Sequence, residues 1–177
     1  MTLLKQSSWA VKRIGVSNFY ASHLTKLFID VCQEFNLEKP FANEIQINPY
    51  VYCLEKDTLD LCFQNSIQLI AYSPLGFNTS RIVLDDMEML SIAEEIGITT
   101  AQLSLAWLLS KNLCVIPKTN NIQRQEENFR SKDAIYSVLH FSVDMDKISE
   151  GKDPGAFLLE TAEKSHEDAK RLVNLEW

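Results

Sequence analysis

The apolar residues of this chain fall into short continuous runs separated by longer stretches with helical spacing. The continuous runs lie at residues 14–19, 44–49, 69–76 and 113–117. Such runs, bounded by polar residues, are typical of strands that are covered on both faces. After the first run, apolar side chains recur at the spacing of one helix face, at Leu24, Leu27, Phe28, Val31 and Phe35. The pattern therefore predicts strands that alternate with helices.

Two further helices are predicted between the third and fourth runs. The first covers residues 86–96 and ends at Gly97, the residue type that most readily takes a left-handed cap. Thr99 and Gln102 then form the T-x-x-Q capping box that begins a second helix over residues 101–111. This second helix is almost entirely apolar, so we expect it to be buried on several sides.

Strands separated by helices indicate βαβ units and a parallel sheet. We therefore predict an α/β fold with four parallel βα units over residues 1–150. A C-terminal helical extension is predicted over residues 151–177, with a helix start at Asp153 and Pro154.

Composition narrows the classes of partner. The chain has 177 residues, of which 46% are hydrophobic, and a net charge of -7. This acidic balance predicts no nucleic-acid partner, because a duplex-binding surface needs excess lysine and arginine. No apolar run approaches the length of about 18 residues that a membrane span requires, so no membrane partner is expected. The four cysteines lack the spacing of a metal or redox motif and fit the reducing cytoplasm.

Polar side chains stand where the predicted strands end. Ser17 and Asn18 end the first strand, Tyr72 ends the third, and Lys118 follows the fourth. Ligand groups gather at the carboxyl ends of strands in parallel α/β folds. Structural roles are the alternative for each: a helix cap for Ser17 and Asn18, packing on a helix for Tyr72, and a solvated turn for Lys118.

The four runs, in this order, closely resemble the second half of an aldo-keto reductase, over roughly residues 3–148. That family folds as an eight-stranded (β/α) barrel and reduces carbonyls with NADPH. The resemblance implies a half-barrel of the TIM-barrel type, equivalent to the fifth to eighth family strands. It also implies NADPH-dependent reduction of a small aldehyde or ketone.

The resemblance assigns a cofactor site. Ser17 and Asn18 would hold the nicotinamide amide, and Tyr72 would stack on the nicotinamide ring. Lys118 and Arg124 would grip the 2′-phosphate, as a point charge and a planar fork. Ser73, Leu75 and Gly76 would pass along the pyrophosphate, and Glu127 and Asn128 would contact adenine. The implied NADP-binding residues are Ser17, Asn18, Glu44, Tyr72, Ser73, Leu75, Gly76, Lys118, Thr119, Arg124, Glu127 and Asn128.

Glu44 departs from the family, which usually has a glutamine there. An ionised glutamate accepts hydrogen bonds but cannot donate one to the nicotinamide carbonyl. A carboxylate beside the ring would also favour the positively charged, oxidised cofactor.

No catalytic residue is assigned. The family's tyrosine acid and its supporting lysine, aspartate and histidine lie in the first half of the barrel, and this chain opens with Met1 shortly before the fifth strand. The histidines do not match the family's catalytic position: His23, His140 and His166. The tyrosines that remain open as proton donors are Tyr20, Tyr50, Tyr52 and Tyr136. Two hypotheses follow: a reductase or its cofactor-binding half, and an inactive nucleotide-binding or regulatory relative.

A half-barrel would leave two unpaired strand edges and an uncovered inner face, which the apolar runs predict to be apolar. Native proteins seldom tolerate such edges. Three outcomes are open: two copies close a barrel together, another protein supplies the missing half, or the chain is a truncated product that folds poorly.

Overall fold

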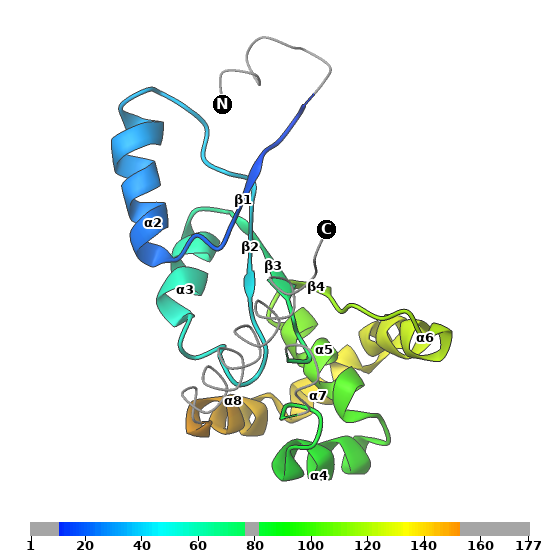
Figure 1. Cartoon of the computed structure of the whole chain (residues 1–177). Coiled ribbons are helices and arrows are strands. Elements are labelled where there is room, and N and C mark those ends of the chain that lie inside the picture. Colours follow the sequence, from blue (N-terminus) through cyan, green and yellow to red (C-terminus); the bar gives the residue numbers. More distant parts are fainter. Residues whose placement is uncertain (1–10, 77–81, 153–177) are drawn as a thin grey trace, which may run out of the picture.

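Strands and helices alternate along the chain in the computed structural model, which describes residues 11–76 and 82–152 (Figure 1). The strands are β1 (Gly15–Ser17), β2 (Ala42–Gln46), β3 (Gln68–Tyr72) and β4 (Cys114–Ile116). The helices are α2 (Ala21–Lys26), the π-helix η1 (Leu27–Gln33), α3 (Lys56–Gln64), α4 (Met87–Ile96), α5 (Thr100–Ser110), α6 (Ile122–Arg130), the 3-10 helix η2 (Ser131–Ala134), α7 (Ile135–His140) and α8 (Ser142–Gly151).

The strands form one parallel sheet in the order β1-β2-β3-β4, so each strand pairs with its neighbours in sequence. Ser17 lies opposite Glu44, and Glu44 lies opposite Ile70 on the other side. The predicted arrangement of four parallel βα units is therefore confirmed. Because the carboxyl ends of parallel strands lie at one edge, the polar residues that end β1, β2 and β3 come close together.

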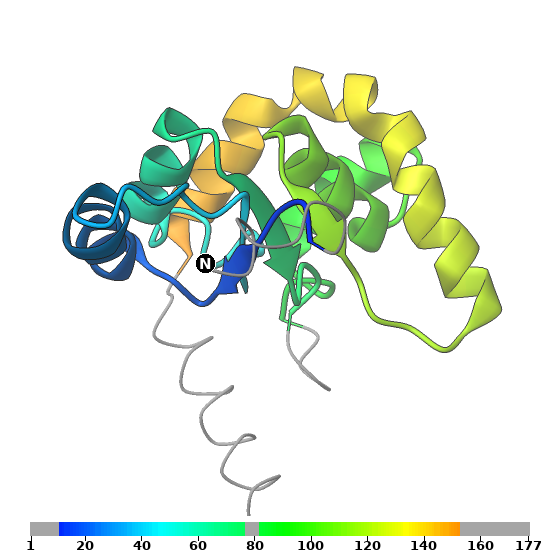
Figure 2. The same ribbon diagram turned by 90° about the horizontal axis from the view of Figure 1, so that it is seen from above.

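The two faces of the sheet differ. Ile45, Leu69 and Ala71 are fully buried, whereas Glu44 and Tyr72, which point the opposite way, are half-buried. Figure 2 shows the helices as an arc along one side of the strands, and no described helix crosses the other side. The sheet is thus covered on one face within the described ranges, and we refer to the other as the open face.

The open face is more polar than the apolar runs predict. Across the sheet, one row on this face is Ser17, Glu44, Ile70 and Cys114. The strict alternation of strand side chains explains the difference, because it sends the apolar residues Ile45, Leu69 and Ala71 to the helix side. Only part of the apolar content of each run therefore reaches the open face.

Helix α5 forms the centre of the core. Leu103, Leu105 and Trp107 are fully buried, as the nearly uniform apolar sequence predicts. The Trp107 indole Nε1 donates a hydrogen bond to Asp146 Oδ1 at 3.2 Å. The Trp107 ring packs edge-on against the Tyr52 ring, with 4.8 Å between the ring centroids. A tryptophan buried in this way needs a partner for its N–H, and Asp146 on α8 supplies it.

The helix boundaries confirm the caps predicted at Gly97 and Thr99, and Asp86, predicted to lie within the helix, proves to be the N-cap of α4. Asp86 accepts hydrogen bonds from the Glu88 and Met89 N–H groups at the start of α4, and Gly97 ends it with φ 79°. Thr99 and Gln102 form the expected capping box of α5.

The segment after β1 differs from its prediction as a single α-helix, because α2 continues as the π-helix η1. The wider π turn rotates the residues that follow it, and Phe35 is 61% exposed although Leu24 is fully buried. The helix expected from Asp153 and Pro154 lies outside the described residues, as does His166.

Candidate functional site

A pocket of about 640 Å³ lies beyond the carboxyl end of β4, between the loop after β3, the start of α5 and the inner side of α6. It brings together most of the residues assigned to the phosphate and adenosine end of the cofactor. These are Leu75, Gly76, Lys118, Thr119, Arg124, Glu127 and Asn128. Loops distant in sequence therefore converge on one pocket.

Lys118 and Arg124 supply the positive charge of this pocket. Lys118 follows β4, and Arg124 stands in the first turn of α6, whose cap is the Asn121 side chain. Both side chains are exposed, and neither makes an ion pair with a residue of 11–76 or 82–152. Two cations without acidic partners in the described chain suit a dianionic phosphate.

The loop after β3 approaches the same pocket with small residues. Ser73 has φ 49° and Gly76 has φ 94°, both in the left-handed region. The Gly76 N–H donates to the Ser73 carbonyl at 3.0 Å, which closes a tight turn. A glycine here lets backbone come close to a ligand that a side chain would keep away.

Glu127 is tied into the structure. Its Oε1 accepts a hydrogen bond from Thr99 Oγ1 at 2.5 Å, and its carbonyl accepts one from Gln102 Nε2 at 3.3 Å. The capping box of α5 is thus joined to α6. A role for Glu127 toward adenine, which the resemblance implies, would use its second carboxylate oxygen.

The start of α5 is part of the pocket that sequence reasoning missed. Thr99, Thr100 and Ala101 line it, together with Leu84, Asp85 and Leu90. The N–H groups at a helix start favour anions. The capping box marked where α5 begins, but no local signal indicates that this end faces Lys118, because the two lie on separate βα units.

A second group of predicted residues lies on the open face where β1, β2 and β3 end: Ser17, Asn18, Glu44 and Tyr72. We call it the nicotinamide cluster, after the role that the resemblance implies and that remains a prediction. The Tyr72 hydroxyl donates to Asn18 Oδ1 at 3.0 Å, and Asn18 Nδ2 donates to Ser17 Oγ at 3.2 Å. The Ser17 hydroxyl donates to the Glu44 carbonyl at 3.3 Å. Burial, followed by the charges of Tyr20 and Glu44, raises the pKa of Tyr72.

These contacts bear on the structural alternatives. Ser17 and Asn18 do not cap α2, because the residue before that helix is Tyr20 and the Ala21 N–H donates to Thr58 Oγ1. Asn18 has φ 57°, which turns its side chain toward Tyr72 at the strand end. Tyr72 hydrogen-bonds across the sheet.

The remaining tyrosines occupy different surroundings. Tyr136 is 83% exposed. Burial and the charge of Glu55 raise the pKa of Tyr20, whose charge also acts on Tyr72 in the nicotinamide cluster. Burial and nearby acidic groups raise the pKa values of Tyr50 and Tyr52 to about 12.

Tyr50 has a lysine and an aspartate beside it that sequence spacing does not reveal. Its hydroxyl donates to Asp86 Oδ2 at 2.8 Å, and Lys152 Nζ lies 2.6 Å from the same oxygen. Because the phenol donates to a carboxylate, its proton is held more tightly, which is the opposite of what a general acid needs. This cluster joins the loop after β2 to α4 and the end of α8.

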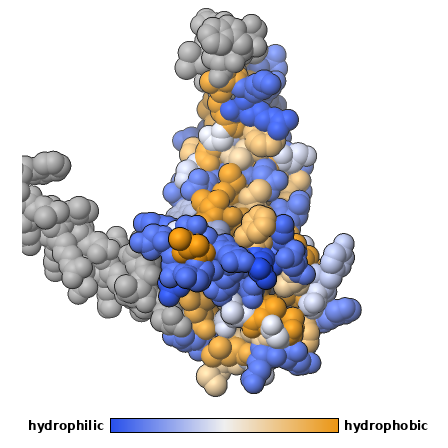
Figure 3. Space-filling view, turned by 90° about the vertical axis from the view of Figure 1, so that its right-hand side faces the viewer, coloured by the Kyte–Doolittle hydropathy of each residue, from blue (hydrophilic) through white to orange (hydrophobic). Residues whose placement is uncertain are grey.

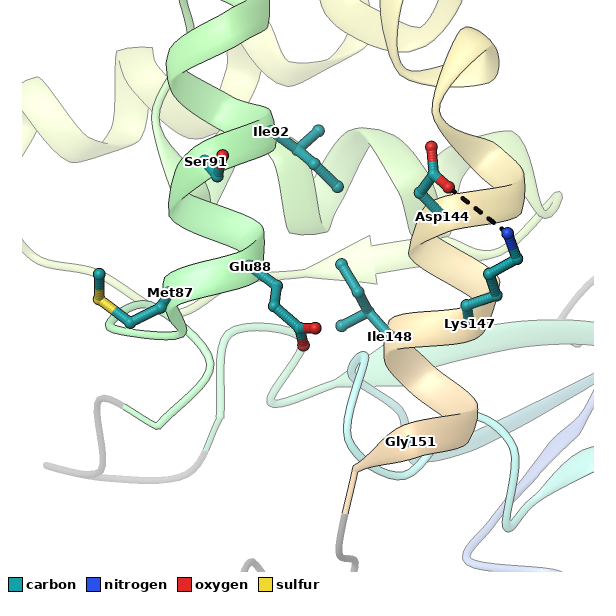
Figure 4. A pocket seen from close by; sticks show the side chains of 8 residues that line it. All are labelled: Met87, Glu88, Ser91, Ile92, Asp144, Lys147, Ile148 and Gly151. Carbon is teal, nitrogen blue, oxygen red and sulfur yellow. Dashed lines mark ion pairs between the residues drawn. The ribbon is translucent and has the colours of Figure 1, made fainter.

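A second hollow, of about 600 Å³, lies between α4 and α8 (Figure 4). Ile92 and Ile148 point into it, and Asp144 and Lys147, 3.8 Å apart, lie on its rim. None of the predicted cofactor residues lines it.

Figure 3 shows the side of the molecule that carries α6, where apolar patches are separated by hydrophilic ones.

Neither a metal centre nor a membrane span is found in the part of the chain that the structure describes. No group of three or more histidine, cysteine, aspartate or glutamate side chains there could hold an ion. No helix there is long and apolar enough to cross a bilayer. All four cysteines are free thiols.

Comparison with known proteins identifies the family. Residues 5–137 match the aldo/keto reductase family, and the chain belongs to it. Glycerol 2-dehydrogenase (NADP(+)) of Hypocrea jecorina is 36% identical over 127 residues, which are 69% of this chain and 38% of that protein. Aldose reductase B of Dictyostelium discoideum is 34% identical over 139 residues, which are 78% of this chain and 41% of the relative.

Solved structures confirm the fold as part of a TIM barrel. An aldo-keto reductase from a Medee basin deep-sea metagenome library superposes with a TM-score of 0.68 at 27% identity, over 86% of this chain and 53% of that one. A mutant of Gox0644 in complex with NADPH gives a TM-score of 0.67 at 27% identity, over 83% and 49%. The chain thus spans about two fifths of these curated relatives and about half of the solved structures.

Proposed function

We propose that this chain binds NADP(H) and serves as the cofactor-binding half of an aldo-keto reductase that reduces an aldehyde or ketone. The observation that carries the proposal is the pocket in which Lys118 and Arg124 lie with Leu75 and Gly76. Two cations without acidic partners in the described ranges stand next to a tight loop and a helix start. Each of these features favours phosphate.

The residues fit the two ends of the cofactor. Lys118 and Arg124 would hold the 2′-phosphate, with the Thr119 hydroxyl beside them. Ser17 and Asn18 offer a hydroxyl and a carboxamide to the nicotinamide amide, and Tyr72 offers a ring to stack on. When bound, NADPH would supply a hydride. A solved neighbour of this fold is an NADPH complex, and a relative is named for NADP(+).

An inactive nucleotide-binding or regulatory relative is the second candidate. It is favoured by the raised pKa values of Tyr20, Tyr50 and Tyr52, which make these phenols poor proton donors. The two candidates share the cofactor site and differ in whether a carbonyl is reduced.

The open face suggests a partner. β1 and β4 are the outer strands of the described sheet, and Ile116 on β4 is 46% exposed. A second copy of the chain, or another protein that supplies the complementary half-barrel, would cover this face and pair these edges. The free cysteines favour a cytoplasmic setting.

Cofactor titration tests the proposal. NADPH and NADH are titrated separately into the purified chain and followed by cofactor fluorescence. NADPH should bind at least about tenfold more tightly, because only its 2′-phosphate gains charge-assisted hydrogen bonds. The difference should shrink as salt screens the exposed cations. Equal affinity for the two cofactors at low salt would contradict the proposal.

A further inference from the structure

Glu44 places a carboxylate in the nicotinamide cluster. The strand register puts it between Ser17 and Ile70 on the open face. Its backbone carbonyl accepts hydrogen bonds from the Asn18 N–H at 2.8 Å and from the Ser17 hydroxyl. This backbone carbonyl is therefore committed to the cluster, and the half-buried side chain extends from the same position toward the open face.

No cation of the described chain neutralises this carboxylate. Glu44 makes no ion pair with a residue of 11–76 or 82–152, and the cations of the site, Lys118 and Arg124, belong to the other pocket. The charge of Glu44 does act on the neighbouring Tyr72. Burial raises the pKa of Tyr72 most, and the charges of Tyr20 and then Glu44 raise it further. The negative field at this end of the site is thus uncompensated within these ranges.

The two forms of the cofactor differ in charge at one place. The nicotinamide ring is positive when oxidised and neutral when reduced, while the phosphates are the same. A carboxylate near the ring therefore attracts one form more than the other. Opposite charges about 6 Å apart at an effective dielectric constant of about 40 correspond to roughly tenfold in affinity.

We propose that Glu44 biases this site toward oxidised NADP⁺ over NADPH by about tenfold, relative to a neutral side chain at the same position. The inference rests on the proposed NADP(H) binding and adds to it the residue that sets preference between the two redox forms. A glutamine at this position would contribute similar hydrogen-bonding shape without the charge.

The test is a ratio of dissociation constants measured on the full chain. NADP⁺ is titrated by calorimetry and NADPH by fluorescence, in the unaltered protein, in Glu44→Gln, and in Glu38→Gln as a control. Glu38 is an exposed glutamate in the loop before β2, away from the cluster. In Glu44→Gln the preference for NADP⁺ should fall about tenfold, while Glu38→Gln should leave it unchanged. Added salt should reduce the preference only where Glu44 is present.

The outcomes separate the two claims. If both forms bind and Glu44→Gln leaves their ratio unchanged, the role of Glu44 is wrong and the proposed cofactor binding stands. If neither form binds to the folded, unaltered chain, both are wrong. Glu44→Ala provides a second variant should the glutamine protein fail to fold, and it should shift the ratio in the same direction.

Discussion

Arg124 and Arg130 lie on the same helix in different surroundings. Arg124 lines the pocket that also holds Lys118 and has no acidic partner in the described ranges. Arg130 Nη2, in contrast, lies 2.6 Å from Glu126 Oε1 on the exposed side of α6. Two arginines on one helix with similar exposure but different neighbours form a natural pair for testing the pocket.

Changing Arg124→Ala should weaken NADPH binding by about 1–3 kcal/mol, the scale of a lost charge-assisted hydrogen bond. NADH binding should hardly change, because it lacks the 2′-phosphate. Arg130→Ala should leave both affinities unaltered. Fluorescence titration of both variants with both cofactors tests this. An equal loss of NADH and NADPH affinity in Arg124→Ala would argue against the assignment of Arg124 to the 2′-phosphate.

The residues that could be assigned in advance were those that match a motif of the family. Lys118, Thr119 and Arg124 lie within one loop and helix start, and the resemblance to the family assigned them to one site together with Leu75 and Gly76, which line the same pocket. The contacts of Thr99 with Glu127 and of Tyr50 with Asp86 and Lys152 could not be predicted. They depend on how separate βα units pack, which no local pattern encodes.

Asp86 joins three elements through one carboxylate that is 4% exposed. Burial acts to raise the pKa of Asp86, but hydrogen bonds from Lys152, the Met89 N–H and Tyr50 outweigh it and hold that pKa below its ordinary value. A lowered folded pKa stabilises the fold above the unfolded pKa of about 3.9 and loses that stabilisation as pH falls through the folded value.

Replacing Asp86→Asn should lower the free energy of unfolding by roughly 1–3 kcal/mol at pH 7, because the half-buried Lys152 then keeps only its ion pair with Glu88, at 2.8 Å. The deficit should shrink as pH falls from about 5 toward 2. Asp144→Asn is the control, since that carboxylate is 58% exposed and 3.8 Å from Lys147. Urea unfolding across this pH range measures the stability of both variants. A stability loss in Asp86→Asn that stays constant with pH would contradict the link between stability and protonation of Asp86.

At the scale of single elements, helix ends carry the clearest sequence signals. The caps at Gly97 and Thr99 were predicted because each is a local hydrogen-bond or backbone requirement. The π turn after Lys26 was not, because its residues keep the apolar spacing of an ordinary helix.

Alanine substitutions at Gly97 and Gly151 test whether the left-handed backbone of Gly97 is what the C-cap of α4 requires. An added Cβ meets no atom within 4 Å at either glycine, but only Gly97 has a positive φ, of 79°. Gly97→Ala should therefore lower the free energy of unfolding by about 1–2 kcal/mol. Gly151→Ala should be neutral or stabilise by up to about 1 kcal/mol, because it lies in α8. Urea midpoints compare them, and equal stability of the two variants would disprove the explanation.

At the scale of the whole molecule, the open face and the outer edges of β1 and β4 govern assembly. We expect a dimer or larger species at micromolar concentration, because burying apolar surface contributes about 25 cal/mol per Å² and unpaired edges seek partners. Light scattering measures this directly. A monodisperse monomer with cooperative thermal unfolding would show that the chain covers this face by itself.

The purified chain alone should not reduce a carbonyl. Among the tyrosines that remain as possible proton donors, Tyr20 is the one whose charge acts on Tyr72 in the nicotinamide cluster. Burial and the charge of Glu55 raise the pKa of Tyr20. A phenol that holds its proton this tightly is a poor general acid, so the rate lacks the enhancement of about 10²–10⁴-fold that proton donation contributes. NADPH oxidation with 4-nitrobenzaldehyde should stay at background. Turnover at enzymatic rates would overturn this, and Tyr20→Phe would then show whether Tyr20 is the donor.

The order of the strands also bears on how the chain folds. Gly15 pairs with Ala42, Ala42 with Gln68, and Ile70 with Cys114, so no strand is inserted between two others. The β3–β4 pairing closes the longest stretch, because both α4 and α5 lie within it, and the entropy of closure grows with length. We therefore expect β1, β2 and β3 to assemble first, with β4 joining late and carrying the loop of Lys118 and Thr119 into place last.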